Sequence, residues 1–235
     1  MRTFLSEGHP AAPLLLYVGR LGVEKKIHRL KKVLDANPGC RLVLIGQGPA
    51  EESLKKTFEG MPAHFVGQLV GGTSISSIKI KYVLLIFYSL SFFAFFVGEE
   101  LSQAFASCDI FVMPSDTETL GFVVMEALAS GLPSVGVEAG GVVDIIKHGN
   151  TGFLAHNDDE MSDFSAYVGK LAQDTALRSN MSKNAVDWAQ GWSWEAATSK
   201  LRNIQYRKAM ELFKCRDAWG RHRTEMEQAI MLREE

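Results

Sequence analysis

Cysteine is scarce in this chain of 235 residues, and its few cysteines are not spaced for a metal site. The three of them stand far apart at Cys40, Cys108 and Cys215, without the CxxC or CxxxxH spacing that tetrahedral zinc needs. A metal site is therefore not expected. The odd number and wide separation predict buried or free thiols in a reducing compartment.

An excess of charge of either sign is also absent. Lysine and arginine number 25 against 27 aspartates and glutamates, which gives a net charge of -2 and a pI near 6.3. A phosphate backbone is bound by a basic surface, so nucleic acid is not an expected partner. The segment Met1–Pro10 carries one arginine and no apolar stretch, so it predicts neither a secretory signal nor a transit peptide.

Two phosphate-binding motifs are incomplete or missing. Gly46 and Gly48 begin a GxGxxG pattern, but the third glycine would fall at position 51, which is Glu51. The pattern GxxxxGK[ST] does not occur in the chain. These absences disfavour a nicotinamide dinucleotide site and leave a P-loop hydrolase unsupported.

What the sequence does contain is a regular alternation of short apolar runs with amphipathic stretches. This pattern predicts a parallel sheet covered by helices, and hence a doubly wound, Rossmann-like α/β domain with a single sizeable core. The expected strands are 14–18, 41–45, 63–66, 109–113, 133–137 and 151–154. The expected helices are 24–34, 50–58, 99–107, 121–130 and 142–147, with further helix toward the C-terminus.

An apolar tract interrupts this alternation at about 72–97. It has two lysines and no acid, and its longest apolar run, Tyr82–Val97, is just short of the roughly 17 to 25 residues that span a bilayer as a helix. Three interpretations are open: a membrane segment, an exposed β-rich insertion, and a splicing or gene-model artefact. The last is preferred, because the tract falls between a strand and its next helix.

Ligands of open parallel sheets bind where the carboxyl ends of the strands lead into helices. After the first expected strand come Gly19, Arg20 and Lys25. Glycine allows close backbone approach, and the two cations could bind a diphosphate, the guanidinium as a fork and the ammonium as a point charge. Taken alone, these cations are better explained as solvated surface charges.

A second motif follows the fourth expected strand, where seven residues separate Glu118 from Glu126. The amides of Leu120, Gly121 and Phe122 would lie at a helix N-terminus, which attracts a pyrophosphate. Carboxylates suit sugar and ribose hydroxyls because each accepts directed, charge-assisted hydrogen bonds. An isolated pair of this kind would be a helix cap and a solvated glutamate; the strand, turn and helix around it favour a site.

These motifs together resemble the family 4 retaining glycosyltransferases, whose GT-B fold pairs two Rossmann-like domains. The resemblance covers roughly 13–71 and 98–206. The matching stretches are Tyr17-Val18-Gly19-Arg20, Glu24-Lys25, Ile45-Gly46-x-Gly48-Pro49, Phe65-Val66-Gly67, Cys108 to Ser115, Glu118 to Glu126, Gly131-Leu132-Pro133 and Gly140-Gly141. Three further stretches, 60–63, 100–104 and 115–121, are most similar to plant and cyanobacterial sulfoquinovosyltransferases, the sulfolipid synthases.

The resemblance implies a role for each candidate residue. Arg20 and Lys25 would hold the donor diphosphate, Glu118 would contact the transferred sugar, and Glu126 would bind the ribose hydroxyls. It further implies a UDP-sugar donor such as UDP-sulfoquinovose, a lipid acceptor such as diacylglycerol, no cofactor and no metal ion. A place at the chloroplast envelope, with peripheral membrane association, is implied in the same way.

The chain departs from the family pattern in two places. The family's N-terminal acceptor domain is absent, and the tract at 72–97 follows a loop, including Gly67, that lies beside the base in the family. We therefore expect a linker remnant at 1–12, a C-terminal donor-binding domain at 13–206 and a solvated helical tail at 207–235. Two hypotheses stay open: the donor-binding half of a glycosyltransferase, and a catalytically inactive truncated isoform that binds nucleotide or acts as an interaction module.

Overall fold

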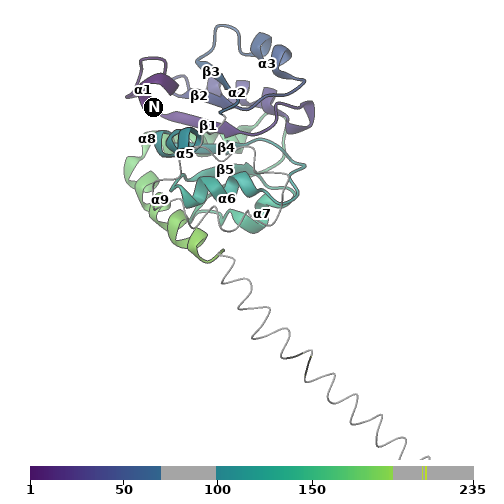
Figure 1. Ribbon diagram of the computed structural model, residues 1–235, viewed down its shortest axis with the longest axis vertical. Helices are drawn as coiled ribbons and strands as arrows, with labels where there is room; N and C mark the ends of the chain where they lie inside the picture. Colours follow the sequence, from purple (N-terminus) through teal and green to yellow (C-terminus); the bar gives the residue numbers. More distant parts are fainter. Residues whose placement is uncertain (70–98, 193–207, 209, 211–235) are drawn as a thin grey trace, which may run out of the picture. The chain divides into compact units, whose positions relative to one another are not determined.

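The computed structural model describes residues 1–69, 99–192, 208 and 210, and it contains a six-stranded sheet with the order β3-β2-β1-β4-β5-β6 (Figure 1). Every neighbouring pair of strands is parallel. The strands are β1 (Leu14–Val18), β2 (Arg41–Ile45), β3 (Ala63–Gly67), β4 (Ile110–Met113), β5 (Ser134–Val137) and β6 (Gly152–Ala155). The predicted Rossmann-like α/β class is confirmed, and the order reverses between β1 and β4.

Helices connect the strands and cover both faces of the sheet. They are α1 (Arg2–Leu5), α2 (Leu30–Ala36), α3 (Glu51–Thr57), α5 (Glu99–Ser107), α6 (Phe122–Ala129), α7 (Val142–Ile145), α8 (Ser162–Gln173) and α9 (Thr175–Gln190). α2 packs against α8, and α6 packs against α9. Because right-handed crossovers from β1 to β2 and from β4 to β5 run in opposite directions along the sheet, these two helix pairs lie on opposite faces.

The core follows from the composition of the strands. All five residues of β1 and all four of β4 are buried, because both strands lie in the middle of the sheet under helices. This explains why their sequences are continuous apolar runs without the alternation of a half-exposed strand. Two cysteines, Cys40 and Cys108, belong to this core as free thiols, and burial raises the pKa of Cys40 to about 11 and of Cys108 to about 12.

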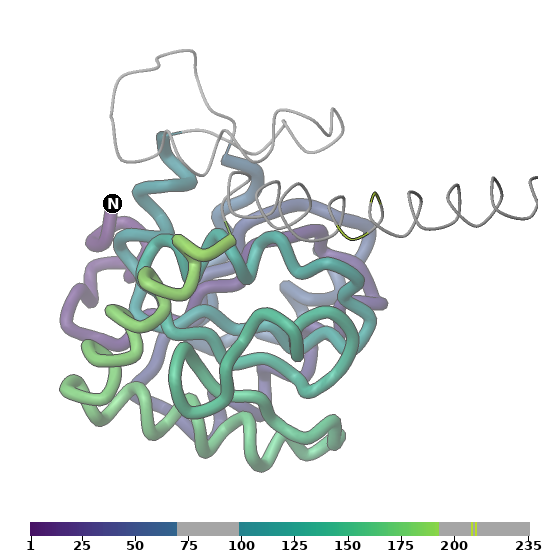
Figure 2. Tube along the Cα trace, turned by 90° about the horizontal axis from the view of Figure 1, so that it is seen from below, coloured from purple at the N-terminus to yellow at the C-terminus, as the bar shows by residue number. Residues whose placement is uncertain are grey.

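The first residues of the chain pack on the sheet domain. Leu5 of α1 is 1% exposed, and α1 lies against α5 although the two are far apart in sequence (Figures 1 and 2). The Arg2 guanidinium forms an ion pair of 2.8 Å with Asp109 and donates a hydrogen bond of 2.7 Å to the carbonyl of Ser107. The division of the chain at residue 12 stays a prediction, but the segment before it is tied to the domain.

One predicted element was wrong. The sequence predicted a continuous helix over 24–34, whereas the structure has two short 3-10 turns, η1 (Val23–Lys25) and η2 (Ile27–Arg29), ahead of α2. The cause is Lys26, whose φ of 51° is left-handed and therefore ends the first turn. The break places Lys25 and Lys26 at the edge of the sheet domain, outside a regular helix.

Three predicted segments lie outside the described residues. They are the tract at 72–97, the end of the predicted domain at 193–206 and, apart from 208 and 210, the tail at 207–235. Among the residues that are described, no helix is both long enough and apolar enough to cross a membrane.

Candidate functional site at the carboxyl edge of the sheet

The turns that follow β1, β2 and β3 are joined by backbone hydrogen bonds. The amide of Gly19 donates to the carbonyl of Ile45 at 3.0 Å, and the amide of Gly46 donates to that of Gly67 at 2.8 Å. Gly46 has a φ of 135°, and a Cβ at this position would lie 2.0 Å from the Gly19 carbonyl oxygen. Only glycine allows this approach, which brings Gly67 to the same edge as Gly19.

The turn after β1 is held from beneath by Tyr17. Its buried hydroxyl donates to the carbonyl of Arg20 at 3.1 Å, and burial, with the charges of Glu118 and Glu24, raises the pKa of Tyr17 well above its usual value. The Arg20 side chain itself is 66% exposed, 3.6 Å from Glu24. Such an exposed pair contributes little to stability, so the Arg20 guanidinium is available to an anionic ligand.

The loops on either side of the switch point are joined by two ion pairs. The Lys25 ammonium lies 2.6 Å from Glu118, and the ammonium of Lys26 contacts Asp116. The Lys26 contact holds the pKa of Asp116 below its usual value. The loop after β1 and the loop after β4 therefore meet through side chains of opposite charge.

The backbone at Glu118 rests on the loop that follows β5. The amide of Gly141 donates to the Glu118 carbonyl at 2.7 Å. A Cβ on Gly140, whose φ is 58°, would lie 2.3 Å from the same carbonyl oxygen, and one on Gly141 would lie 2.2 Å from the carbonyl oxygen of Thr119. The two glycines thus determine how closely the β5 loop supports the backbone that carries Glu118.

The N-terminus of α6 adds partial positive charge to this edge. The helix begins at Phe122, after Gly121 in a left-handed conformation with a φ of 60°, and the Gly121 carbonyl accepts the first helical hydrogen bond from Val124 at 2.9 Å. Leu120, just before the helix, is 60% exposed. The predicted position of Leu120, Gly121 and Phe122 at a helix N-terminus is therefore found, and such a terminus favours an anion.

Glu126 is in a different environment from Glu118. It lies within α6, and burial raises its pKa from 4.5 to about 7. Among the described residues, neither an ion pair nor a hydrogen bond of its carboxylate is found. A carboxylate without a compensating partner is ready to accept hydrogen bonds from a ligand.

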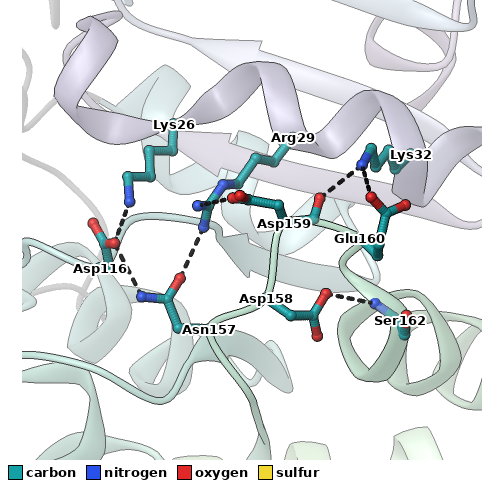
Figure 3. A network of polar contacts seen from close by, with 9 residues as sticks. All are labelled: Lys26, Arg29, Lys32, Asp116, Asn157, Asp158, Asp159, Glu160 and Ser162. Carbon is teal, nitrogen blue, oxygen red and sulfur yellow. Dashed lines mark hydrogen bonds and ion pairs between the residues drawn. The ribbon is translucent and has the colours of Figure 1, made fainter.

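The structure thus brings together some of the predicted residues and shows others that the sequence did not reveal. Lys25 and Glu118 are in contact, Arg20 lies in the same turn as Lys25, and Glu126 is carried by the helix that follows Glu118. Sequence reasoning missed Lys26, Asp116 and Asn157, of which Asn157 donates to Asp116 at 3.1 Å (Figure 3). The signal for Asn157 was available, because it follows β6 at the carboxyl edge of the sheet.

Two surface hollows are found among the described residues. One, of about 560 Å³, lies between α2 and α8, and the other, of about 690 Å³, lies between the η1 and η2 turns and α3. Neither is lined by Glu118 or Glu126. Within 1–69 and 99–192, no group of three or more His, Cys, Asp or Glu is arranged to hold a metal ion.

A parallel sheet of this order belongs to the Rossmann-like class, and cations, a helix N-terminus and carboxylates lie at its switch point. Residues 90–188 match the family model described as glycosyl transferases group 1. The predicted family resemblance is confirmed.

Known relatives agree with this assignment. The chain is 43% identical over 213 residues to the sulfoquinovosyl transferase SQD2 of Arabidopsis thaliana, covering 89% of this chain and 36% of that protein. It spans less than half the length of each of the curated relatives reported for it.

Solved structures share the fold. Anabaena Alr3699/HepE in complex with UDP and glucose has a TM-score of 0.63 at 18% identity, over 89% of this chain and 53% of that one. A sucrose-phosphate synthase from Thermosynechococcus elongatus has a TM-score of 0.64 at 22% identity, over 86% and 47% of the two chains. At these identities the likeness establishes the fold, which is of the GT-B glycosyltransferase kind.

Proposed function

We propose that this chain is the donor-binding half of a glycosyltransferase that takes a sugar from a UDP-sugar. The observation that carries the proposal is the contact of Lys25 with Glu118 at the switch point, with a half-buried Glu126 on the following helix that has no ion-pair or hydrogen-bond partner among the described residues. The cation and the helix N-terminus suit the diphosphate of such a UDP-sugar, and the two carboxylates suit the hydroxyls of its transferred sugar and its ribose. The relative in Arabidopsis is named a sulfoquinovosyl transferase, which supports the same class of reaction.

In the proposed reaction each group has one task. Arg20, Lys25 and the amides from Leu120 to Phe122 bind the diphosphate, and Gly67 lies beside the base. Glu118 contacts the transferred sugar, and Glu126 accepts hydrogen bonds from the ribose hydroxyls. When the bond between the sugar carbon and the phosphate oxygen breaks, the electron pair stays with UDP, the acceptor hydroxyl oxygen bonds to the sugar carbon, and its proton passes to the departing phosphate. The two cations and the helix N-terminus stabilise the charge on UDP without a metal ion.

The substrates follow from the named relative by similarity alone. We propose UDP-sulfoquinovose as the donor and a lipid, diacylglycerol, as the acceptor, in sulfolipid synthesis at the chloroplast envelope with peripheral membrane association. The alternative, a catalytically inactive isoform or interaction module, is not favoured by the relatives, because the named relatives are transferases.

Calorimetric titration with UDP tests the proposal. We expect the parent chain to bind UDP and Glu126→Ala to bind it roughly tenfold more weakly or worse, because hydrogen bonds to a charged acceptor are each worth about 1.5 to 3 kcal/mol. Glu100→Ala is the matched control, since Glu100 is an exposed glutamate on α5. A parent chain that produces no heat, or equal losses in the two variants, would contradict donor binding at this edge.

A further inference from the structure

Asp116 lies at the meeting point of three loops. It precedes Glu118 by two residues in the loop after β4, and its side chain is 14% exposed. Its Oδ2 contacts the ammonium of Lys26, from the turn after β1, and accepts a hydrogen bond of 3.1 Å from Asn157, in the loop after β6 (Figure 3). Its buried Oδ1 has no hydrogen bond within the described residues, so Oδ2 alone joins the three loops.

Asn157 is oriented by a second contact. Its Oδ1 accepts a hydrogen bond of 2.9 Å from Arg29, while its amide nitrogen donates to Asp116 (Figure 3). Donor and acceptor on the two sides leave only one orientation of the amide that satisfies both partners. Arg29 belongs to η2, so the contact ties the loop after β6 to the same turn that carries Lys26.

Lys26 takes a backbone conformation that lysine disfavours. A left-handed φ of 51° is unfavourable for a residue with a Cβ, and nothing about a surface turn requires lysine there. That conformation separates two consecutive lysines, so that Lys25 reaches Glu118 while Lys26 reaches Asp116. The two ion pairs therefore join the same two loops at neighbouring points.

We infer that Lys26, Asp116 and Asn157 form a positioning network for Lys25 and Glu118. The inference rests on the proposed function, in which Lys25 turns to the donor diphosphate and Glu118 to its sugar. The contact between Lys25 and Glu118 is given up when the donor binds. The proposed function gives Lys26 and Asp116 no task in binding the UDP-sugar, so their contact keeps the two loops at a fixed separation while the first pair opens.

UDP titration of Asp116→Asn and Asn157→Asp tests the network. Asp116→Asn removes the charge that Lys26 contacts, and Asn157→Asp sets a second carboxylate against Asp116 while keeping an acceptor for Arg29. We expect UDP affinity to fall roughly three- to tenfold in both variants, and amide hydrogen exchange to speed up across 114–121 without ligand. The control is Lys32→Met, because Lys32 forms a neighbouring ion pair with Glu160, 2.9 Å away, that lies outside the network of Lys26, Asp116 and Asn157.

A double-mutant cycle separates positioning from general stability. If Lys26 and Asp116 act together, Lys26→Met combined with Asp116→Asn weakens UDP binding no more than either change alone. Variants that melt earlier but bind UDP with the parent affinity while folded would overturn the inference and leave the proposed function standing. A parent chain that does not bind UDP would overturn both, and unchanged exchange across 114–121 would count against the network whatever the nucleotide result.

Discussion

Glu118 and Glu126 belong to one continuous unit of strand, loop and helix that runs from β4 to α6. Their surroundings differ in whether the carboxylate has a partner. Glu118 lies in a loop, contacts Lys25 at 2.6 Å and has its backbone supported by Gly140 and Gly141. Glu126 lies in a helix, and burial alone shifts its pKa upward. Glu118, at the loop end, is thus held in place by partners, whereas for Glu126, at the helix end, the described part of the chain shows no compensating charge.

This difference separates two ways of preparing a site. A preformed ion pair fixes the position of a side chain before a ligand arrives, but it has to be exchanged for ligand contacts. A desolvated, uncompensated carboxylate destabilises the fold, and it is stabilised when a ligand donates a hydrogen bond to it. If the two ends work in these ways, changes near Glu118, the loop end, should disturb the conformation of its loop. Changes at Glu126, the helix end, should alter the free energy of unfolding in a pH-dependent manner.

The largest effect on stability is expected from Gly140→Ala, which disturbs the backbone contact that supports Glu118. The added Cβ would meet the Glu118 carbonyl oxygen at 2.3 Å, and alanine disfavours a φ of 58°. We expect the free energy of unfolding to fall by about 3 kcal/mol, as measured in urea, because both the clash and the backbone strain must be relieved.

Gly149→Ala is the control for that strain. Gly149 also has a positive φ, 76°, but nothing lies within 4 Å of its added Cβ. We expect a loss of about 1 kcal/mol, the backbone term alone. Equal losses in the two variants would mean that the contact between Gly140 and Glu118 does not matter for the loop.

A smaller, pH-dependent effect is expected at the helix end from Glu126→Gln. The pKa of Glu126 in the folded state is about 7, above its ordinary value of 4.5, so the folded state binds more protons between these values and the parent loses stability as pH rises through that window. The neutral glutamine lacks this loss. At pH 8 the variant should be more stable by on the order of 2 kcal/mol, with the two proteins similar near pH 4.5.

Urea unfolding of the parent and of Glu126→Gln at pH 5 and pH 8 checks this sign. The difference between the two proteins should grow with pH and level off above about pH 7. Two parallel stability curves would show that the carboxylate is solvated or compensated in the folded protein, and the contrast between the two ends would then be lost.

The sequence predicted much of this arrangement, and its limits have physical causes. Apolar runs predicted the strands because both faces of the sheet are covered. The left-handed Lys26 could not be foreseen, since lysine carries no preference for that conformation. Its pairing with Asp116, 90 residues away, depends on how two loops meet, which no local pattern encodes.

The smallest effect on stability is expected from Lys25→Met, which makes the loop end resemble the helix end by leaving Glu118 unpaired. Both side chains are about one-fifth exposed, so solvent screens part of the attraction, and the free energy of unfolding should fall by roughly 0.5 to 1 kcal/mol at low salt. Lys55→Met, the control, removes a more exposed pair with Glu51 and should leave the free energy of unfolding nearly unchanged. Should Lys25→Met stabilise the protein, the ion pair of Lys25 with Glu118 would be destabilising overall. Glu118 would then, like Glu126, be kept at the expense of stability, and the preformed ion pair could no longer explain how the loop end is held.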